Sequence, residues 1–355
     1  MGRNIPVITG GVDTHSRTHQ AAVVDALGRI LGTAEFEVGA DGYRRLLAWL
    51  RRHGELRQVG IEGTGTYGAG LCRYLLEEGV SVVEVDRPDR RMRRQRGKSD
   101  PIDAEAAARA TLAGTATALP KKRGGVVESI RALRAARSGA VKARTAASNG
   151  LKAMILTAPT ELRAAFDGLG FPALIAICAA LRPDRSRLAD PTQGTKAGLR
   201  SLARRITTLS NEIAELDAAL AELVHKAAPR TIALRAIGVD HAGQLLATAG
   251  ENPERLRSEA AFAHLCGVAP IPASTGRTQR HRLHRGGDRN ANRALHLAVV
   301  VRMRCCPRTR AYVERRTAEG LSKSEIMRCL KRYLAREVYQ SLCADMRALN
   351  ELDKI

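Results

Sequence analysis

Four carboxylates in the N-terminal part of the chain have the types and positions needed to bind a divalent cation. Asp13 lies near the end of the segment VITGGVDT and Glu62 near the end of QVGIEG, and both segments have the composition of β-strands. Asp100 and Asp103 are three residues apart at the start of an alanine-rich segment, which places both on one face of a helix's first turn. Clustered carboxylates repel unless a hard cation lies between them, so the set predicts one or two Mg²⁺ and chemistry on phosphodiesters.

The same residues have structural interpretations as well. Asp13 also fits the end of a strand, and Glu62 also fits the surface. Asp100-Pro101-Ile102-Asp103 fits a helix N-terminus, with Asp100 as the cap and Asp103 favourable to the helix dipole. A capping carboxylate can still bind a metal, so the interpretations are compatible. The basic stretch before Asp100 and the placement of the other two at strand ends favour the metal site.

Ser274 is a second candidate for chemistry. It lies in the glycine- and proline-rich segment PIPASTGR and is followed by many arginines. A serine hydroxyl that attacks phosphorus needs its pentavalent transition state neutralised, and arginine can do this. Taken alone, the sequence favours a simpler interpretation, in which Ser274 is a turn residue and the arginines form a phosphate-binding face.

Two basic stretches predict contacts with nucleic-acid backbones. The chain has 58 Lys and Arg against 36 Asp and Glu, a net charge of +22, which makes a polyanionic partner the expected one. Aromatic residues are only 3% of the chain, so base stacking is a poor candidate for the source of sequence specificity. The predicted nucleic-acid-binding residues are Arg90, Arg91, Arg93, Arg94, Arg96, Lys98, Arg277, Arg280, Arg282, Arg285, Arg289 and Arg293.

The elements that must position the carboxylates form an α/β unit. Short β-branched segments and amphipathic segments alternate in the order β-β-β-α-β-α-β, an antiparallel meander followed by parallel crossovers, which is the ribonuclease-H-like (RuvC-like) arrangement. Asp41 is the expected cap of the first helix. The predicted strands are 7–14, 20–28, 29–38, 58–63 and 80–86, and the predicted helices are 44–50 and 67–78.

A long helical region follows. Leu202, Ile206, Leu209, Ile213, Leu216, Leu220 and Leu223 repeat at alternating steps of four and three, the seam of a coiled coil or a long helical hairpin. We expect a helical stalk that contacts a protein partner; a second copy of the chain is one candidate for that partner. An ordinary amphipathic helix that packs inside the chain is the alternative.

The C-terminal part is predicted to be mainly α-helical. LRAIGVDHAGQLLATAG has the helix–turn–helix layout of a helix-hairpin-helix element, which offers backbone N–H groups to a phosphate, although Asp240 stands where a second glycine is usual. A plain αα-hairpin fits equally. We expect three domains: 1–118, 119–228 and 229–355.

Cysteine usage and hydropathy predict the compartment. The seven cysteines form no C-x-x-C pair, which argues against a disulfide framework and structural zinc. No apolar segment approaches the roughly 20 residues of a membrane span, and no secretion signal is visible at the N-terminus. We expect a cytoplasmic, nucleoid-associated protein with no membrane partner.

Several segments together resemble one family. GVDTHSRTHQAAVV, VGIEGTGTYG, KSDPIDAEAAARA, and the pairing of LRAIGVDHAGQLLATAG with GVAPIPASTGRTQRHRLHRGGDRNANRAL are similar to the DEDD transposases of the insertion-sequence one-ten family, which includes Piv-type DNA invertases. The resemblance covers nearly the whole chain in the family's order. It implies a RuvC-like N-terminal domain, a helical coiled-coil insertion and a C-terminal transposase domain.

The resemblance also implies roles for residues and partners. Asp13, Glu62, Asp100 and Asp103 match the D-E-D-D metal set, which implies Mg²⁺. Ser274 matches the serine that attacks DNA and becomes covalently linked to it; relatives often carry two serines where this chain has Ser274-Thr275. The implied function is a transposase that cuts and rejoins donor and target DNA, guided by a bridge RNA, as a dimer or tetramer assembled through the coiled coil.

Other functions would use the same residues differently. A RuvC-like metal-dependent nuclease or junction resolvase would use the four carboxylates and leave Ser274 structural. An actin- or sugar-kinase-like ATPase shares the early strand order but needs a second, duplicated half with glycine-rich phosphate loops. A binding module would use the acidic residues only as caps. Of these, only the recombinase requires both Asp13 and Ser274.

Overall fold

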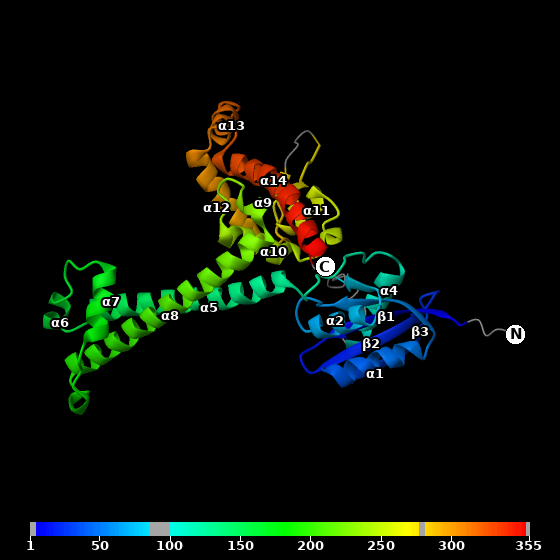
Figure 1. The fold of residues 1–355 in the computed structure, drawn as a ribbon, viewed down its shortest axis with the longest axis horizontal. Helices are drawn as coiled ribbons and strands as arrows, with labels where there is room; N and C mark the ends of the chain where they lie inside the picture. The colour runs from blue at the N-terminus through cyan, green and yellow to red at the C-terminus, as the bar shows by residue number, and fades with distance from the viewer. Residues whose placement is uncertain (1–4, 86–99, 277–280, 353–355) are drawn as a thin grey trace. The chain divides into compact units, whose positions relative to one another are not determined.

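The computed structural model describes residues 5–85, 100–276 and 281–352. They divide into two compact units, of which the first comprises 1–124 with 249–257 and the second 125–248 with 258–355. Figure 1 shows an α/β first unit and a helical second unit. The chain thus returns to its first unit for one short segment.

A five-stranded mixed sheet forms the centre of the first unit. Its spatial order is β3-β2-β1-β4-β5, with β1, β2 and β3 antiparallel and with β4 parallel to both β1 and β5. This confirms the predicted order of elements and the ribonuclease-H-like arrangement. The strands are β1 (Val7–Thr14), β2 (Thr18–Asp25), β3 (Ile30–Glu37), β4 (Glu55–Glu62) and β5 (Val82–Val85).

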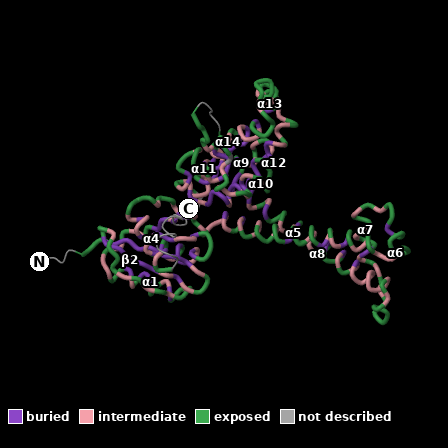
Figure 2. Tube along the Cα trace, turned by 180° about the vertical axis from the view of Figure 1, so that it is seen from behind, coloured by how far each residue is buried: buried purple, intermediate pink, exposed green. Residues whose placement is uncertain are grey.

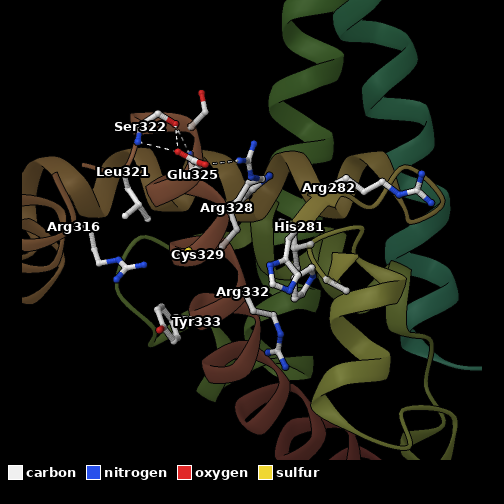
Figure 3. A pocket seen from close by; sticks show the side chains of 15 residues that line it. His281, Arg282, Arg316, Leu321, Ser322, Glu325, Arg328, Cys329, Arg332 and Tyr333 are labelled. Carbon is white, nitrogen blue, oxygen red and sulfur yellow. Dashed lines mark hydrogen bonds and ion pairs between the residues drawn. The ribbon is translucent and has the colours of Figure 1, made fainter. Parts of the chain in front are cut away.

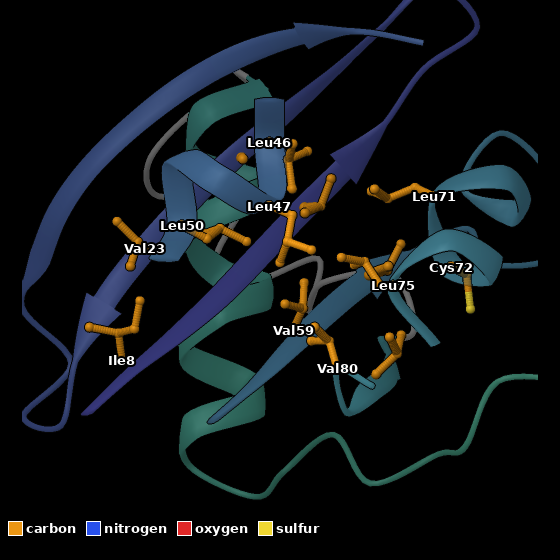
Figure 4. Packing of buried hydrophobic residues seen from close by; sticks show 14 residues of the cluster. Ile8, Val23, Leu46, Leu47, Leu50, Val59, Leu71, Cys72, Leu75 and Val80 are labelled. Atoms are coloured by element: carbon orange, nitrogen blue, oxygen red, sulfur yellow. The ribbon is translucent and has the colours of Figure 1, made fainter. Parts of the chain in front are cut away.

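One face of the sheet is covered by α1 (Ala40–Arg51) and α2 (Ala69–Glu77). Leu46, Leu47 and Leu50 of α1 and Leu71 and Leu75 of α2 pack against side chains of β1, β2 and β4 (Figure 4). Figure 2 shows this concentration of buried residues along the strands. Since apolar burial is the main favourable term in folding, this layer fixes the sheet on which the site is built.

The predicted cap of α1 was wrong. The helix begins at Ala40 with Gly39 at the N-cap, and no side chain there accepts a capping hydrogen bond. Asp41 lies inside the first turn instead, where its charge still favours the helix dipole. Because Gly39 has φ 137°, a backbone region that suits glycine, the chain turns into the helix two residues earlier than the polar cap pattern indicated.

Helix α4 (Asp100–Leu112) covers the opposite face of the sheet. Gly11 of β1 makes this possible, because a Cβ on it would lie 2.2 Å from the carbonyl oxygen of Ala104. Gly60 pairs with Gly11 on the neighbouring strand, and a Cβ on Gly60 would lie equally close to the side chain of Thr111 in the same helix. The two glycines therefore let α4 rest directly on the sheet, with the helix N-terminus near the carboxyl ends of β1 and β4.

The segment 249–257 packs against 116–124 at the β5 edge of the first unit. Ala118 forms a β-bridge with Glu84, and Arg255 lies 3.7 Å from the Glu84 carboxylate. Asn252 donates through Nδ2 to the Pro120 carbonyl, and η2 (Pro253–Arg255) lies within the segment. These contacts close the edge strand, which would otherwise expose unpaired backbone groups.

The second unit has a long helical arm. Helices α5 (Val126–Leu156) and α8 (Pro191–Ala227) run antiparallel, since Gly150 lies beside Leu202 and Arg137 binds Asp217. Helices α6 (Thr160–Ala164) and α7 (Phe171–Ala180) pack near the C-terminal end of α5 and the start of α8 (Figure 1). The short helix η1 (Arg185–Arg187) precedes α8.

The leucine–isoleucine seam of α8 divides between two environments. Ile206, Ile213 and Leu220 are buried within the chain, whereas Leu202, Leu209, Leu216 and Leu223 are only half-buried. The internal hairpin accounts for the first set. Leu202 also packs inside the chain, against the cluster that α5 and α7 form with α8. A coiled coil with a partner stays a prediction that rests on Leu209, Leu216 and Leu223.

Helices and one small hairpin form the rest of the second unit. The strands β6 (Pro270–Pro272) and β7 (His281–Leu283) pair antiparallel. Asp345 of the last helix is buried and accepts hydrogen bonds from the backbone N–H groups of Arg230 and Thr231. The helices are α9 (Pro229–Ile232), α10 (Val239–Ala249), α11 (Glu259–Leu265), α12 (Arg289–Cys305), α13 (Pro307–Ala318) and α14 (Lys323–Leu352).

The segment predicted as a helix-hairpin-helix element has one regular helix. Leu234–Gly238 forms turns, with Ala236 at φ 66°, between the four-residue α9 and α10. The helix-hairpin-helix assignment and the predicted domain boundaries stay predictions.

Among the described residues, no helix is both long enough and apolar enough to cross a membrane. The only sheets in the described ranges are the five-stranded one and the β6–β7 pair, so these ranges contain no duplicated α/β half of the kind an actin-like ATPase needs.

Candidate functional site

Acidic side chains and one histidine meet at the carboxyl end of β1. Asp13 is the penultimate residue of that strand and is 7% exposed. His15 Nε2 lies 3.2 Å from Asp13 Oδ2 and 3.4 Å from Asp100 Oδ2. One ligand atom from each of the three residues lies within 4.8 Å of the others, so Asp13, His15 and Asp100 could hold a metal ion.

The electrostatics of Asp13 fit a cation site. Burial raises the pKa of its carboxyl above the ordinary range, and the nearby Asp103 and Asp100 raise it further, while His15 lowers it. A buried carboxylate that faces other carboxylates is costly without a positive charge. A hard divalent cation, which takes carboxylate oxygens as ligands, would relieve this repulsion.

The predicted carboxylates occupy adjacent positions in the fold. Val12 pairs with Ile61, so Asp13 and Glu62 follow one residue later on neighbouring parallel strands. Thr14 donates through Oγ1 to the Glu62 carbonyl at 2.8 Å, which ties the two strand ends together. Asp103 is 4% exposed in the first turn of α4, one turn from Asp100. The fold thus brings the ends of β1 and β4 and the start of α4 to one edge.

His15 was missed by the sequence reasoning. The signal was present in the GVDTH motif, because residues i and i+2 of an extended chain point to the same side. His15 lies two residues after Asp13 and so points toward the carboxylates. Its imidazole contacts both Asp13 and Asp100, which links the strand end to the helix start.

Ser274 lies in the second unit, in the loop that follows β6. Ser274 is exposed, as are its neighbours Ala273 and Thr275. Gly276 has φ 48°, a left-handed conformation that marks the turn predicted there. An exposed serine two residues beyond a paired strand is accessible to a large substrate.

The base of this hairpin is tightly held. Asn292 of α12 donates through Nδ2 to the Gly267 carbonyl at 2.7 Å, and a Cβ on Gly287 would lie 2.1 Å from the Gly267 nitrogen. Asp288 caps α12 by accepting from the backbone N–H of Asn290 and also accepts from Thr248 Oγ1. The loop that carries Ser274 therefore projects from a fixed base.

The structure describes only some of the predicted nucleic-acid-binding residues. Arg282, Arg285, Arg289 and Arg293 are exposed, and Arg289 and Arg293 are one turn apart on α12, so both lie on one helix face. Their exposure leaves the guanidinium groups accessible to phosphates. Outside the described residues lie Arg90, Arg91, Arg93, Arg94, Arg96, Lys98, Arg277 and Arg280.

Comparison with known proteins gives two family matches. Residues 10–158 match a family of transposases named for DEDD and IS110. Residues 232–314 match the transposase IS116/IS110/IS902 family. The first match contains all four predicted carboxylates, and the second contains Ser274.

Two curated relatives come from insertion elements. An uncharacterized 42 kDa protein of insertion element IS900 from Mycobacterium paratuberculosis is 29% identical over 134 residues, which is 37% of this chain and 34% of that protein. An uncharacterized 43.6 kDa protein of insertion element IS110 from Streptomyces coelicolor is 31% identical over 136 residues, which is 37% of this chain and 33% of that protein. The chain thus matches about a third of the length of each relative.

Proposed function

The chain belongs to the IS110 family of transposases, and we propose that it moves an insertion sequence by cutting and rejoining DNA. The observation that carries this proposal is the cluster of Asp13, His15 and Asp100 at one edge of a ribonuclease-H-like sheet. A metal-binding edge in a strongly basic chain suits work on a polyanionic phosphodiester.

The proposed metal ligands are Asp13, Glu62, Asp100 and Asp103, with one or two Mg²⁺. A bound divalent cation would neutralise charge on the oxygens of the scissile phosphate. The protein residues position the site: Thr14 holds the end of β4, and His15 orients the carboxylates of Asp13 and Asp100. The close contact of α4 with Gly11 fixes the helix that carries the last two ligands.

Ser274 is the proposed nucleophile. Its Oγ forms a bond to phosphorus and loses its proton, while the bond from phosphorus to one deoxyribose oxygen breaks and that oxygen takes up a proton. After the strands exchange, the deoxyribose hydroxyl of the partner strand attacks the phosphoserine and releases the serine. The number of phosphoester bonds is unchanged, so rejoining needs no external energy source. The exposed loop after β6 supports this role because it gives DNA access to the hydroxyl.

Basic residues are the proposed contacts to donor DNA, target DNA and a guide (bridge) RNA. Arg282, Arg285, Arg289 and Arg293 are available at the surface for phosphate contacts. With 3% aromatic residues, the chain has few side chains for reading bases by stacking, which suits a protein that delegates sequence reading to RNA pairing.

Self-association is proposed to use the arm. The half-buried positions Leu209, Leu216 and Leu223 recur every seven residues along α8, which is the repeat that a second helix can pack against. A dimer or tetramer formed in this way would bring several active sites to one pair of DNA molecules.

The test is a strand-exchange assay with donor and target DNA in the presence and absence of Mg²⁺ and of RNA transcribed from the flanking DNA of the gene. Wild type, Asp13→Ala and Ser274→Ala are compared. We expect recombinant DNA only with wild type, Mg²⁺ and RNA. Recombination without RNA would remove RNA guidance from the proposal. Cleavage that survives Ser274→Ala but not Asp13→Ala would favour the alternative, a RuvC-like metal-dependent nuclease or junction resolvase.

A further inference from the structure

The second unit contains a cavity of about 780 Å³ that is separate from the carboxylate cluster. It lies between the β6–β7 hairpin, the end of α13 and the first turns of α14 (Figure 3). Most of its charged lining comes from residues 316–332, which lie beyond the last residue, 314, that either family match covers. Its size is in the range of pockets that hold small organic ligands.

The lining of this cavity is strongly basic. Its lining residues include five Arg and Lys and a single acidic residue, Glu325. Glu325 accepts from the backbone N–H and the hydroxyl of Ser322 in a capping box at the start of α14, and it lies 4.0 Å from Arg328. The Glu325 carboxylate is therefore already engaged by Ser322 at the helix N-terminus, and the cavity lining carries more positive than negative charge. The five are Arg282, Arg316, Arg328, Lys331 and Arg332.

Lys331 is the most deeply buried of these groups. It is 6% exposed, and its Nζ donates to Asn292 Oδ1 at 2.9 Å. Among the described residues, no carboxylate lies within ion-pair distance of its ammonium group. Burial and the neighbouring Arg328 lower the pKa of Lys331. A buried cation without a counter-ion is costly, so an anion in the cavity would be strongly favoured.

Two arginines have donor atoms to spare. Arg332 binds Glu259 through Nη2, but its Nη1 is buried and has no hydrogen-bond partner among the described residues. Arg316 binds Glu319 through Nη1, and its Nε is likewise buried without a partner in the described part of the chain. Buried polar groups are normally hydrogen-bonded, so each of these guanidinium groups keeps one donor that the described residues do not satisfy.

One wall of the cavity is aromatic. Tyr333 is 49% exposed and packs edge-on against Tyr312, with ring centroids 5.6 Å apart. The Arg315 and Arg316 guanidinium groups lie 5.3 and 6.0 Å from the centre of the Tyr312 ring. The exposed Tyr333 ring, supported by Tyr312, can stack with a flat, unpaired base.

We propose that this cavity binds one unpaired nucleotide of a nucleic-acid strand, with its phosphate on Lys331, Arg328 and Arg332 and its base on Tyr333. The proposal deepens the proposed function, because it rests on the chain acting on nucleic acid. A base inside a duplex is already stacked and paired, so the site selects single-stranded segments. Stacking tolerates every base, so the site adds affinity without reading sequence.

The test measures affinity of the full-length protein for fluorescent oligonucleotides of about 12 residues, a length that fits known single-strand sites. The probes are oligo(dT), oligo(rU) and a duplex DNA of equal length. The variants Arg328→Gln and Tyr333→Leu are compared with Arg347→Gln, an exposed arginine on the same helix outside the cavity, and with Tyr333→Phe, which keeps the ring. The melting temperature of each variant shows that it is folded.

We expect Arg328→Gln and Tyr333→Leu to weaken single-strand binding by about tenfold or more, with Tyr333→Phe and Arg347→Gln within about twofold of wild type. Duplex binding should change by less than about twofold in all of them. The probe that shows the loss, DNA or RNA, identifies the strand that the cavity takes. Photo-crosslinking of a halogenated uracil probe to the peptide that contains Tyr333 gives an independent readout.

Equal losses for single strands and duplex, or no loss with Tyr333→Leu, would overturn the proposal; so would a wild type that binds no single strand. These outcomes are separable from failure of the proposed function. A protein that recombines DNA normally with Tyr333→Leu contradicts only the cavity's role. A protein that shows the Tyr333-dependent single-strand binding but no Ser274-dependent exchange contradicts only the recombinase.

Discussion

At the level of single residues, carboxylates cluster around Asp13 although the net charge of the chain is +22. Asp13 is buried beside Asp100 and Asp103, and burial together with these neighbours raises the pKa of its carboxyl. Such an arrangement is costly unless positive charge lies beside it, from His15 or from a bound cation. Residues selected only for stability would not be placed in this way, so the cluster is best explained by a function that uses the cation.

Replacing Asp13 by Asn is expected to stabilise the metal-free protein and to reduce its response to Mg²⁺. The substitution removes one of the mutually repelling charges and one ligand together. Scanning calorimetry should show a melting temperature that is higher by about 2–4 °C without metal, which corresponds to roughly 1 kcal/mol. Mg²⁺ should raise the melting temperature of wild type more than that of the variant.

The control is Asp41→Asn, which removes an exposed carboxylate in α1. It should leave the response to Mg²⁺ as in wild type. Equal Mg²⁺ responses in wild type and Asp13→Asn would contradict the assignment of Asp13 as a ligand.

His19 predicts a pH dependence of stability. The side chain is fully buried in β2, stacks on Tyr43, and has no hydrogen-bond partner among the described residues for either ring nitrogen. Burial lowers its pKa, so below about pH 6.5 the unfolded chain binds a proton that the folded chain does not. The free energy of unfolding should therefore decrease as the pH falls, by at most about 1.4 kcal/mol per pH unit from this group.

Urea denaturation between neutral and mildly acidic pH measures this effect. His19→Phe should flatten the dependence, because it keeps a stacked ring and removes the titrating group. His296→Phe, at an exposed position of α12, should leave the wild-type slope. An unchanged slope in His19→Phe would contradict the prediction.

Much of the candidate site was predictable at this scale, because strand ends and helix starts leave local signals. Asp13 and Glu62 end β-branched segments, and Asp100 begins a helix, so their convergence followed from the strand order. Their distances, and the contribution of His15, were not predictable, since they depend on how closely α4 packs on the glycines of β1 and β4.

At the element scale, the long helices have two kinds of apolar position. Ile206, Ile213 and Leu220 of α8 are covered by the antiparallel α5, and the intervening Leu209 and Leu216 are only half-covered. The heptad pattern predicted a seam correctly but did not identify its partner, because the same spacing serves a helix of the same chain and a helix of another copy.

Leu209→Glu with Leu216→Glu is expected to weaken self-association at least about tenfold, since it places like charges in a packed seam. The fold should persist, because the buried positions are unchanged. Sedimentation equilibrium measures the mass, and circular dichroism measures the helix content. Thr208→Glu with Ala218→Glu, at exposed positions of α8, is the matched control. A wild-type chain that is monomeric, or a variant with the wild-type mass, would contradict assembly through the arm.

The sheet was the most predictable element and the small helices were the least. Five strands and their order followed from alternating β-branched segments and the breaks between them. The α1 cap failed because backbone conformation at Gly39 overrode side-chain preference. The addition of 249–257 to the first unit depends on polar contacts of Asn252 and Arg255 with segments far away in sequence, which no local pattern reports.

At the scale of the whole molecule, positive charge dominates. A net charge of +22 opposes a compact chain and favours a polyanion. Binding of nucleic acid should therefore be steeply dependent on salt, with log K falling by about 0.9 per duplex phosphate contacted for each unit of log[salt]. Fluorescence anisotropy over a salt series measures the slope, and a slope near zero would contradict backbone recognition.

The proposed covalent phosphoserine intermediate at Ser274, together with its dependence on the carboxylates of the first unit, can be tested directly. The most direct test incubates wild type, Asp13→Ala and Ser274→Ala with donor DNA, target DNA, flanking-region RNA and Mg²⁺, then denatures the reaction and resolves protein-linked DNA on a gel. We predict an adduct only with wild type, and a DNA-linked peptide that contains Ser274 by mass spectrometry. Cleaved DNA without an adduct, or an adduct that persists in Ser274→Ala, would contradict the claim.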